Sequence, residues 1–172
     1  MFHVERNTGS MTYKRFIIII FSFFLFCSCA ISRSPIQIPD YKLEPNGKEI
    51  LDNKGLTAFI FENNLTKIPI EQYLSAKLNT DNYSQKEYWV TIEKDKYKLI
   101  IYDYNEFEKY FNSANYAVIN FEPENATKGD QRKFIAISMI NAYNVDCLAE
   151  NSLFQNIAVN YLRNLKTEYY NQ

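Results

Sequence analysis

Apolar and polar residues alternate along residues 48–172 in a pattern that predicts eight elements. Five segments rich in apolar and aromatic residues are expected to be strands: 56–61, 87–92, 97–104, 116–121 and 133–142. Three segments with apolar residues every three or four positions are expected to be helices: 70–78, 106–111 and 152–168. The order is therefore βαββαββα. It predicts an α+β fold, with three helices packed on a largely antiparallel sheet of about five strands.

The clearest local feature is a hairpin formed by 87–92 and 97–104. A four-residue loop would pair Ile92 with Tyr97 and give the hairpin one wholly apolar face, which is expected to point to the core. The opposite face carries three large apolar side chains rimmed by polar ones: Trp89, Ile100 and Tyr102. Because Trp and Tyr dominate the centres of many protein interfaces, this trio is the candidate interface. Burial of the same face under a helix is the alternative.

Two helices have recognisable ends or faces. The C-terminal helix is expected to begin at a cap, Asn151 or Ser152, and to bury one apolar stripe. Its predicted members are Phe154, Ile157, Ala158, Tyr161, Leu162 and Leu165. The shorter helix at 106–111 is expected to use Asn105 as its cap. Strand 133–142 is almost continuously apolar, which predicts an interior strand covered on both faces.

A basic pair and an apolar run precede the predicted domain. Lys14 and Arg15 are followed by the apolar segment 16–26, interrupted only by Ser22, and then by Cys-Ser-Cys-Ala. A short basic region, an apolar core and small residues after it are typical of a secretory signal peptide. Met11 stands just before the basic pair and is the expected initiator, unless the region before the apolar core is unusually long.

This segment resembles the signal peptide of bacterial lipoproteins, in which the thiol that follows the cleavage site is acylated. Ser28 directly before Cys29 fits that pattern, whereas Cys27 follows the bulky Phe26. The resemblance implies a signal peptide at 1–28, acylation with palmitate-type chains at Cys29, and a location in the cell envelope. An uncleaved transmembrane anchor is the alternative, although the apolar run is shorter than the ~20 residues that span a bilayer. In both cases the remainder of the chain faces the periplasm or the cell exterior.

Residues 29–47 are predicted to form a lipidated, flexible tether. Pro35, Pro39 and Pro45, together with serines, disfavour regular structure and favour extended backbone. The tether would hold the folded part off the membrane. The single α+β domain is therefore expected to span 48–172.

Charge and composition exclude several functions. The chain has 19 Lys and Arg against 20 Asp and Glu, without a block of like charge, so nucleic acid is not an expected partner. Its one histidine, His3, precedes the signal segment, which leaves the mature part without a Ser-His-Asp triad or a histidine zinc site. Four glycines in the whole chain make no phosphate-binding loop. Neither a cofactor nor a metal is predicted.

The remaining reactive groups are one thiol and several carboxylates. Cys147 has no basic neighbour in the sequence that could stabilise a thiolate, so it is expected to be a small buried side chain. If Cys29 escaped acylation, a disulfide with Cys147 would be possible in an oxidising compartment. Glu122, Glu124 and Asp130 flank one polar loop and could bind Ca²⁺ or act as the acid and base of a glycosidase. Their spacing matches no calcium loop, and a solvated loop is favoured.

Three functional hypotheses follow from these observations. The favoured one is a membrane-anchored lipoprotein whose α+β domain binds an envelope protein without catalysis, as an assembly subunit or an immunity-type inhibitor. The alternatives are a carboxylate-dependent hydrolase acting on envelope polysaccharide and a lipoprotein that binds a small ligand in an aromatic-lined pocket. An exposed aromatic patch on a closed surface would favour the first. A deep pocket with converging carboxylates would favour the second, and an apolar pocket the third.

Overall fold

The computed structural model describes residues 34–50, 54–64, 67–119 and 132–172. Its elements, in chain order, are β1 (Ile36–Gln37), β2 (Lys42–Glu44), β3 (Glu49–Ile50), β4 (Lys54–Gly55), β5 (Ala58–Glu62), α2 (Ile70–Lys77), β6 (Glu87–Ile92), β7 (Asp95–Ile101), α3 (Tyr104–Tyr110), the 3₁₀ turn η1 (Ser113–Asn115), β8 (Tyr116–Ala117), β9 (Phe134–Asn141) and α4 (Gln155–Tyr170). The predicted signal peptide and Cys29 lie outside the described residues.

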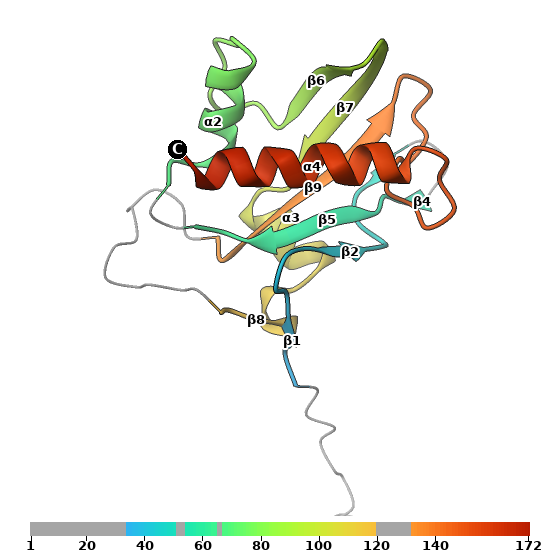
Figure 1. Ribbon diagram of the computed structural model, residues 1–172. Coiled ribbons are helices and arrows are strands. Elements are labelled where there is room, and N and C mark those ends of the chain that lie inside the picture. The colour runs from blue at the N-terminus through green and yellow to red at the C-terminus, as the bar shows by residue number, and fades with distance from the viewer. Residues whose placement is uncertain (1–33, 51–53, 65–66, 120–131) are drawn as a thin grey trace, which may run out of the picture. The chain divides into compact units, whose positions relative to one another are not determined.

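Five strands form the main sheet, in the order β2-β5-β9-β7-β6, and every neighbouring pair is antiparallel (Figure 1). The predicted α+β class is confirmed. The identity of one strand was predicted wrongly. Segment 116–121 was expected in the sheet, but its first two residues form β8, which pairs in parallel with β1 outside the main sheet. The fifth strand of the sheet is β2 instead.

The segment before Lys48 is folded from Pro35 onward, which corrects the predicted flexible tether and the predicted start of the domain. Ile38 is buried, and β2 pairs with the first three residues of β5. The compact unit runs from Pro35 to Gln172. Prolines flank β2 rather than interrupt it, so its backbone can pair with β5 as an edge strand. The prolines correctly indicated extended backbone, but they did not reveal that part of this backbone forms the edge strand β2.

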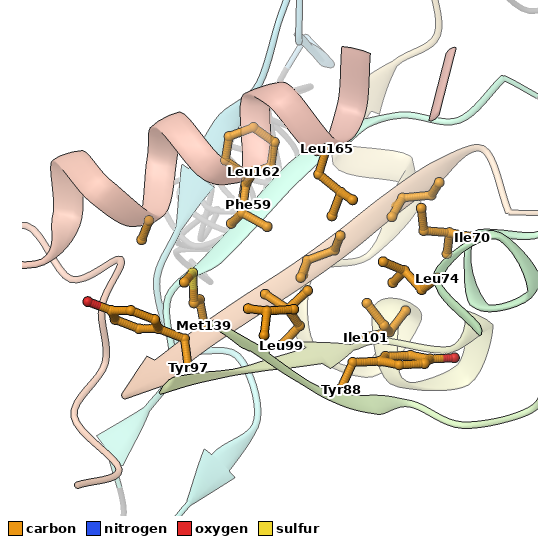
Figure 2. Close-up of a cluster of buried hydrophobic side chains, with 14 of the residues drawn as sticks. Phe59, Ile70, Leu74, Tyr88, Tyr97, Leu99, Ile101, Met139, Leu162 and Leu165 are labelled. Carbon is orange, nitrogen blue, oxygen red and sulfur yellow. The ribbon is translucent and has the colours of Figure 1, made fainter. Parts of the chain in front are cut away.

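Helices cover both faces of the sheet. In Figure 1, α4 crosses one face together with α2, while α3 lies behind the opposite face. Adjacent residues of β5, Phe59 and Ile60, belong to different cores because successive side chains of a strand point to opposite faces. Figure 2 shows Leu162 and Leu165 of α4 reaching toward the sheet in the first core. The second core gathers aromatic side chains of α3 and β8 against β5 and β9.

β9 is the central strand of the sheet, and all eight of its residues are buried. This confirms the predicted interior strand. Ile135, Ile137 and Met139 belong to the core under α4, whereas Phe134 and Ala136 belong to the core under α3.

The β6–β7 hairpin is tighter than predicted. The two strands are joined by Glu93 and Lys94 alone, so Ile92 pairs with Asp95 and Tyr88 with Leu99. Glu93 has a φ of 58°, the left-handed conformation that such two-residue turns require. The predicted register was thus wrong by two residues. Since a shift of two preserves the face of every side chain, the apolar face still points to the core, as predicted.

The ends of α3 and the buried face of α4 also differ from the prediction. Asp103, rather than Asn105, caps α3: its Oδ1 accepts a hydrogen bond from Glu106 N at 2.8 Å, and Glu106 Oε2 accepts one from Asp103 N at 3.1 Å. Helix α4 begins at Gln155, and its buried residues are Ala158, Leu162, Leu165 and Tyr169. Ile157, predicted to be part of the buried stripe, is 37% exposed.

The two faces of α4 lead to a testable difference in stability. Leu162→Ala should lower the free energy of unfolding by about 2–5 kcal/mol, because it leaves a cavity between α4 and the sheet. Ile157→Ala on the same helix should lower it by no more than about 1 kcal/mol, because its side chain is partly exposed and is not part of the core under α4. Urea denaturation of both variants measures the difference, and equal losses would contradict this packing.

Candidate functional site

The structure separates the three residues of the candidate interface. The side chain of Trp89 is 54% exposed, whereas those of Ile100 and Tyr102 are 1% and 0% exposed. Ile100 packs against Leu56 and Ile140, and Tyr102 lies in the core beneath α3. The prediction of an exposed trio was therefore wrong for Ile100 and Tyr102. Segments distant in the sequence cover them.

Tyr102 holds the N-terminal segment against the centre of the sheet. Its hydroxyl accepts a hydrogen bond from Lys48 N at 2.9 Å and lies 2.9 Å from Ser138 Oγ. Ser138 Oγ in turn donates to Thr57 O at 2.8 Å, so Tyr102 is the donor toward Ser138. Burial raises the pKa of Tyr102, which keeps its hydroxyl protonated for this chain of bonds. Tyr102 thus has a structural role.

Gly47 is required beside this chain of hydrogen bonds. A Cβ atom at Gly47 would come within 2.7 Å of Leu56 O and still closer to the Tyr102 hydroxyl. Because backbone atoms cannot give way as a flexible side chain does, any larger residue would push the N-terminal segment off the sheet. This close approach explains why residue 47 is a glycine.

Trp89 remains as the exposed member of the candidate interface, and it has partners that the sequence pattern did not identify. Lys98, its cross-strand neighbour, places Nζ 5.1 Å from the centroid of the indole ring. The same Nζ donates to Glu87 Oε2 at 3.1 Å. A cation over an exposed ring contributes about 0.5–1 kcal/mol. The contacts hold the indole on the outer face of the hairpin and reduce the entropy that a partner would have to overcome.

The outer edge of β6 adjoins Trp89. Among the residues that the structure describes, no strand pairs with this edge. Ile101 N donates to Lys86 O at 2.8 Å, which makes Lys86 and Ile101 a hydrogen-bonded pair of the ladder. Because such pairs alternate with non-hydrogen-bonded ones, the backbone N–H and C=O groups of Trp89 and Thr91 point away from β7. Trp89 thus combines an exposed side chain with an open backbone edge.

The pocket bounded by α3 and the start of β9 is too small for the small-ligand hypothesis. Its volume is about 140 Å³, against roughly 300–1,000 Å³ for typical ligand sites. Two of its charged side chains have structural contacts. Glu108 accepts a hydrogen bond from Ser113 N at 3.2 Å, and Arg132 makes two 2.7 Å bonds to the carboxylate of Glu71. These contacts give both charged side chains a role in local structure.

Carboxylates in the described part of the chain offer little support for a hydrolase. Asp146 accepts hydrogen bonds from Thr57 N at 2.7 Å and Leu148 N at 2.9 Å, so it links the sheet to the segment before α4. Asp103 caps α3. Within the described ranges, no group of three or more His, Cys, Asp or Glu side chains could hold a metal ion. The loop at 122–130, with Glu122, Glu124 and Asp130, lies outside the described residues.

Cys147 is buried and unpaired with another cysteine, as predicted for a small apolar side chain. Burial raises its pKa to about 12, and the nearby negative charge of Asp146 acts in the same direction. At pH 8 the thiolate fraction is therefore about a thousandfold lower than for an ordinary thiol with a pKa of 9.0. The thiol is unsuited to nucleophilic chemistry.

The chain matches no protein-family model, no curated protein and no solved structure. No helix within the described ranges has both the length and the apolar character needed to cross a membrane. The function therefore has to be inferred from the residues and their geometry.

The environment of Cys147 predicts how the thiol reacts. In the folded protein at pH 8 it should resist iodoacetamide, because it is inaccessible and protonated, and it should react at once in denaturing urea. Mass spectrometry of the peptide containing Cys147 measures the modification. Rapid labelling of the folded chain would show that the segment around Cys147 opens readily.

Proposed function

We propose that this chain is a membrane-anchored envelope lipoprotein whose α+β domain binds a protein partner without catalysing a reaction. The observation that carries the proposal is the juxtaposition of the exposed Trp89 with the open edge of β6. The buried positions of Ile100 and Tyr102 restrict the candidate interface to this edge.

The partner would contribute an extended segment that adds a strand to β6. Backbone groups of Trp89 and Thr91 would supply the hydrogen bonds of the new ladder, as in other cases of strand addition. An apolar side chain of the added strand would pack against the indole, which Lys98 already orients. An assembly subunit and an immunity-type inhibitor could both bind a partner through this surface.

The membrane anchor of the proposal rests on the signal-like segment and Cys29. Cys29→Ser should abolish incorporation of a fatty-acid analogue when the full chain is expressed in bacteria, because the acylated thiol is removed. Metabolic labelling followed by gel fluorescence measures it, with Cys147→Ser as the matched control that should keep the label. Undiminished label in Cys29→Ser would refute acylation at this residue, and loss confined to Cys27→Ser would move the site.

The partner-binding edge can be tested with two substitutions on β6. Trp89→Ala should weaken partner binding at least tenfold, equivalent to about 1.4 kcal/mol, while the free energy of unfolding falls by less than about 1 kcal/mol. Thr91→Pro should have a similar effect on binding, because it removes a backbone N–H that points away from β7. A photo-crosslinking residue at position 91 of the full chain identifies the partner in cells.

Tyr143→Ala is the matched control for these substitutions, since Tyr143 is an exposed aromatic residue in the turn after β9 rather than on β6. It should leave binding unchanged, and a crosslinker at position 143 should give no specific adduct. If Trp89→Ala and Thr91→Pro bind the identified partner as well as the original chain does, the β6 edge is not the interface. A stability loss of several kcal/mol in Trp89→Ala would show a structural role for the ring.

A further inference from the structure

The folded unit begins close to the predicted acylation site. Pro35, the first residue of the compact unit, is six residues after Cys29, and Ile36 already pairs with Tyr116. An extended chain spans at most about 3.3–3.6 Å per residue, so six residues reach about 20 Å. Part of this length is needed to cross the lipid headgroup layer, which is about 5–8 Å thick. The remaining reach is about 12–15 Å.

A reach of this size restricts the orientation of the domain. A compact unit of this length has a radius of gyration of about 14 Å. The chain between Cys29 and Pro35 is therefore too short for the domain to turn freely above the membrane. The end of the domain that faces the bilayer must be the end where the chain enters it, at β1 and its partner β8.

Two segments, 34–39 and 112–119, contain β1 and β8 and define what is called here the β1–β8 end. Neither segment contains Lys, Arg, Asp, Glu or His, although charged residues make up 23% of the chain. Ile36 is 46% exposed and Ile119 is 48% exposed. An uncharged surface with exposed isoleucines has the composition of a face that enters the membrane interface.

Charged side chains that border the β1–β8 end are engaged within the protein. Lys42 and Glu44 form an ion pair, and Lys42 Nζ also lies 5.6 Å from the centroid of the Tyr116 ring. Glu62 accepts hydrogen bonds from Ile119 N, and Glu108 accepts one from Ser113 N. No cluster of basic residues occurs in the two segments that could attract anionic lipids. The contact would therefore rely on apolar side chains.

We propose that the β1–β8 end docks on the zwitterionic interface of the membrane that carries the lipid anchor. The inference depends on the proposed acylation of Cys29. Figure 1 shows β1 and β8 at the end of the molecule away from the β6–β7 hairpin. Docking in this orientation directs Trp89 and the edge of β6 away from the bilayer, where a partner can reach them.

The test uses the full acylated chain, purified and reconstituted into phosphatidylcholine vesicles whose acyl chains carry bromine, a quencher of indole fluorescence. One variant combines Ala114→Trp with Trp89→Phe, so that its one indole lies in the exposed 3₁₀ turn of the β1–β8 end. The other is the original chain, whose one tryptophan is Trp89. The first should lose most of its emission and the second should lose little. Raising the salt from about 0.1 to about 0.5 M should not change this result.

Two further variants separate docking from simple proximity. Adding Ile36→Asp and Ile119→Asp to the reporter chain should abolish quenching, whereas adding Tyr143→Asp, also an exposed apolar position, should preserve it. A flexible spacer of about twenty residues inserted after Arg33 should leave most of the quenching intact, because the surface itself has affinity for the interface. Loss of quenching on insertion of the spacer would show that the short linker alone causes proximity, and would overturn the docking.

Fatty-acid labelling of the same samples distinguishes failure of this inference from failure of the proposed function. An acylated chain in which Ala114→Trp remains unquenched would overturn docking and leave the lipoprotein proposal standing. A chain without label would overturn the acylation at Cys29, and the docking inference would fall with it.

Discussion

The burial of β9 on both faces is the constraint on which the rest of the structure depends. A strand with eight buried residues needs a neighbour on each edge to satisfy its backbone and a layer on each face to exclude water. β5 and β7 supply the edges. Helices α2 and α4 cover one face, and α3 with the β1–β8 pair covers the other. Every larger element of the described chain contributes to this arrangement.

Polar groups inside the domain are tied into the same arrangement. The Tyr102 hydroxyl links Lys48 N to Ser138, and Ser138 continues the chain to Thr57 O. Asp146 joins Thr57 N to the segment that leads into α4. Because an unpaired buried polar group is costly, each of these contacts stabilises one packing of the N-terminal segment over its alternatives. The buried polar residues therefore determine how the N-terminal segment packs, rather than forming a reactive site.

The two edge strands of the sheet, β2 and β6, differ in a way that bears on function. At one edge, β2 and the segment leading into it fold against the core, so the chain enters the domain beside β8. At the other edge, β6 is open and carries Trp89. A lipid anchor at Cys29 would hold the first end near a membrane and leave the second end accessible. The proposal that one end lies at the membrane and the other binds a partner follows from topology and chain length rather than from any reactive group.

The sequence by itself determined which side chains of the strands point to the core and what kind of fold results. Alternation of apolar and polar residues assigned Tyr88 and Leu99 to the buried face, because the side-chain period of a strand is two whatever its partner. That assignment held even though the register was wrong by two residues. The turn at Glu93 carries no glycine or asparagine signal, so its two-residue length could not be predicted from the sequence.

Only the tertiary structure decided which residues on the outer face of the hairpin are buried. Trp89, Ile100 and Tyr102 share one face of the hairpin, and nothing in their local pattern distinguishes them. Ile100 is buried because Leu56 packs on it, and Tyr102 because α3 and the N-terminal segment close over it. Trp89 lies on the edge strand, beyond the reach of those elements, and stays exposed. Burial of a residue on an outer face depends on segments far away in the chain, and periodicity within one strand carries no information about them.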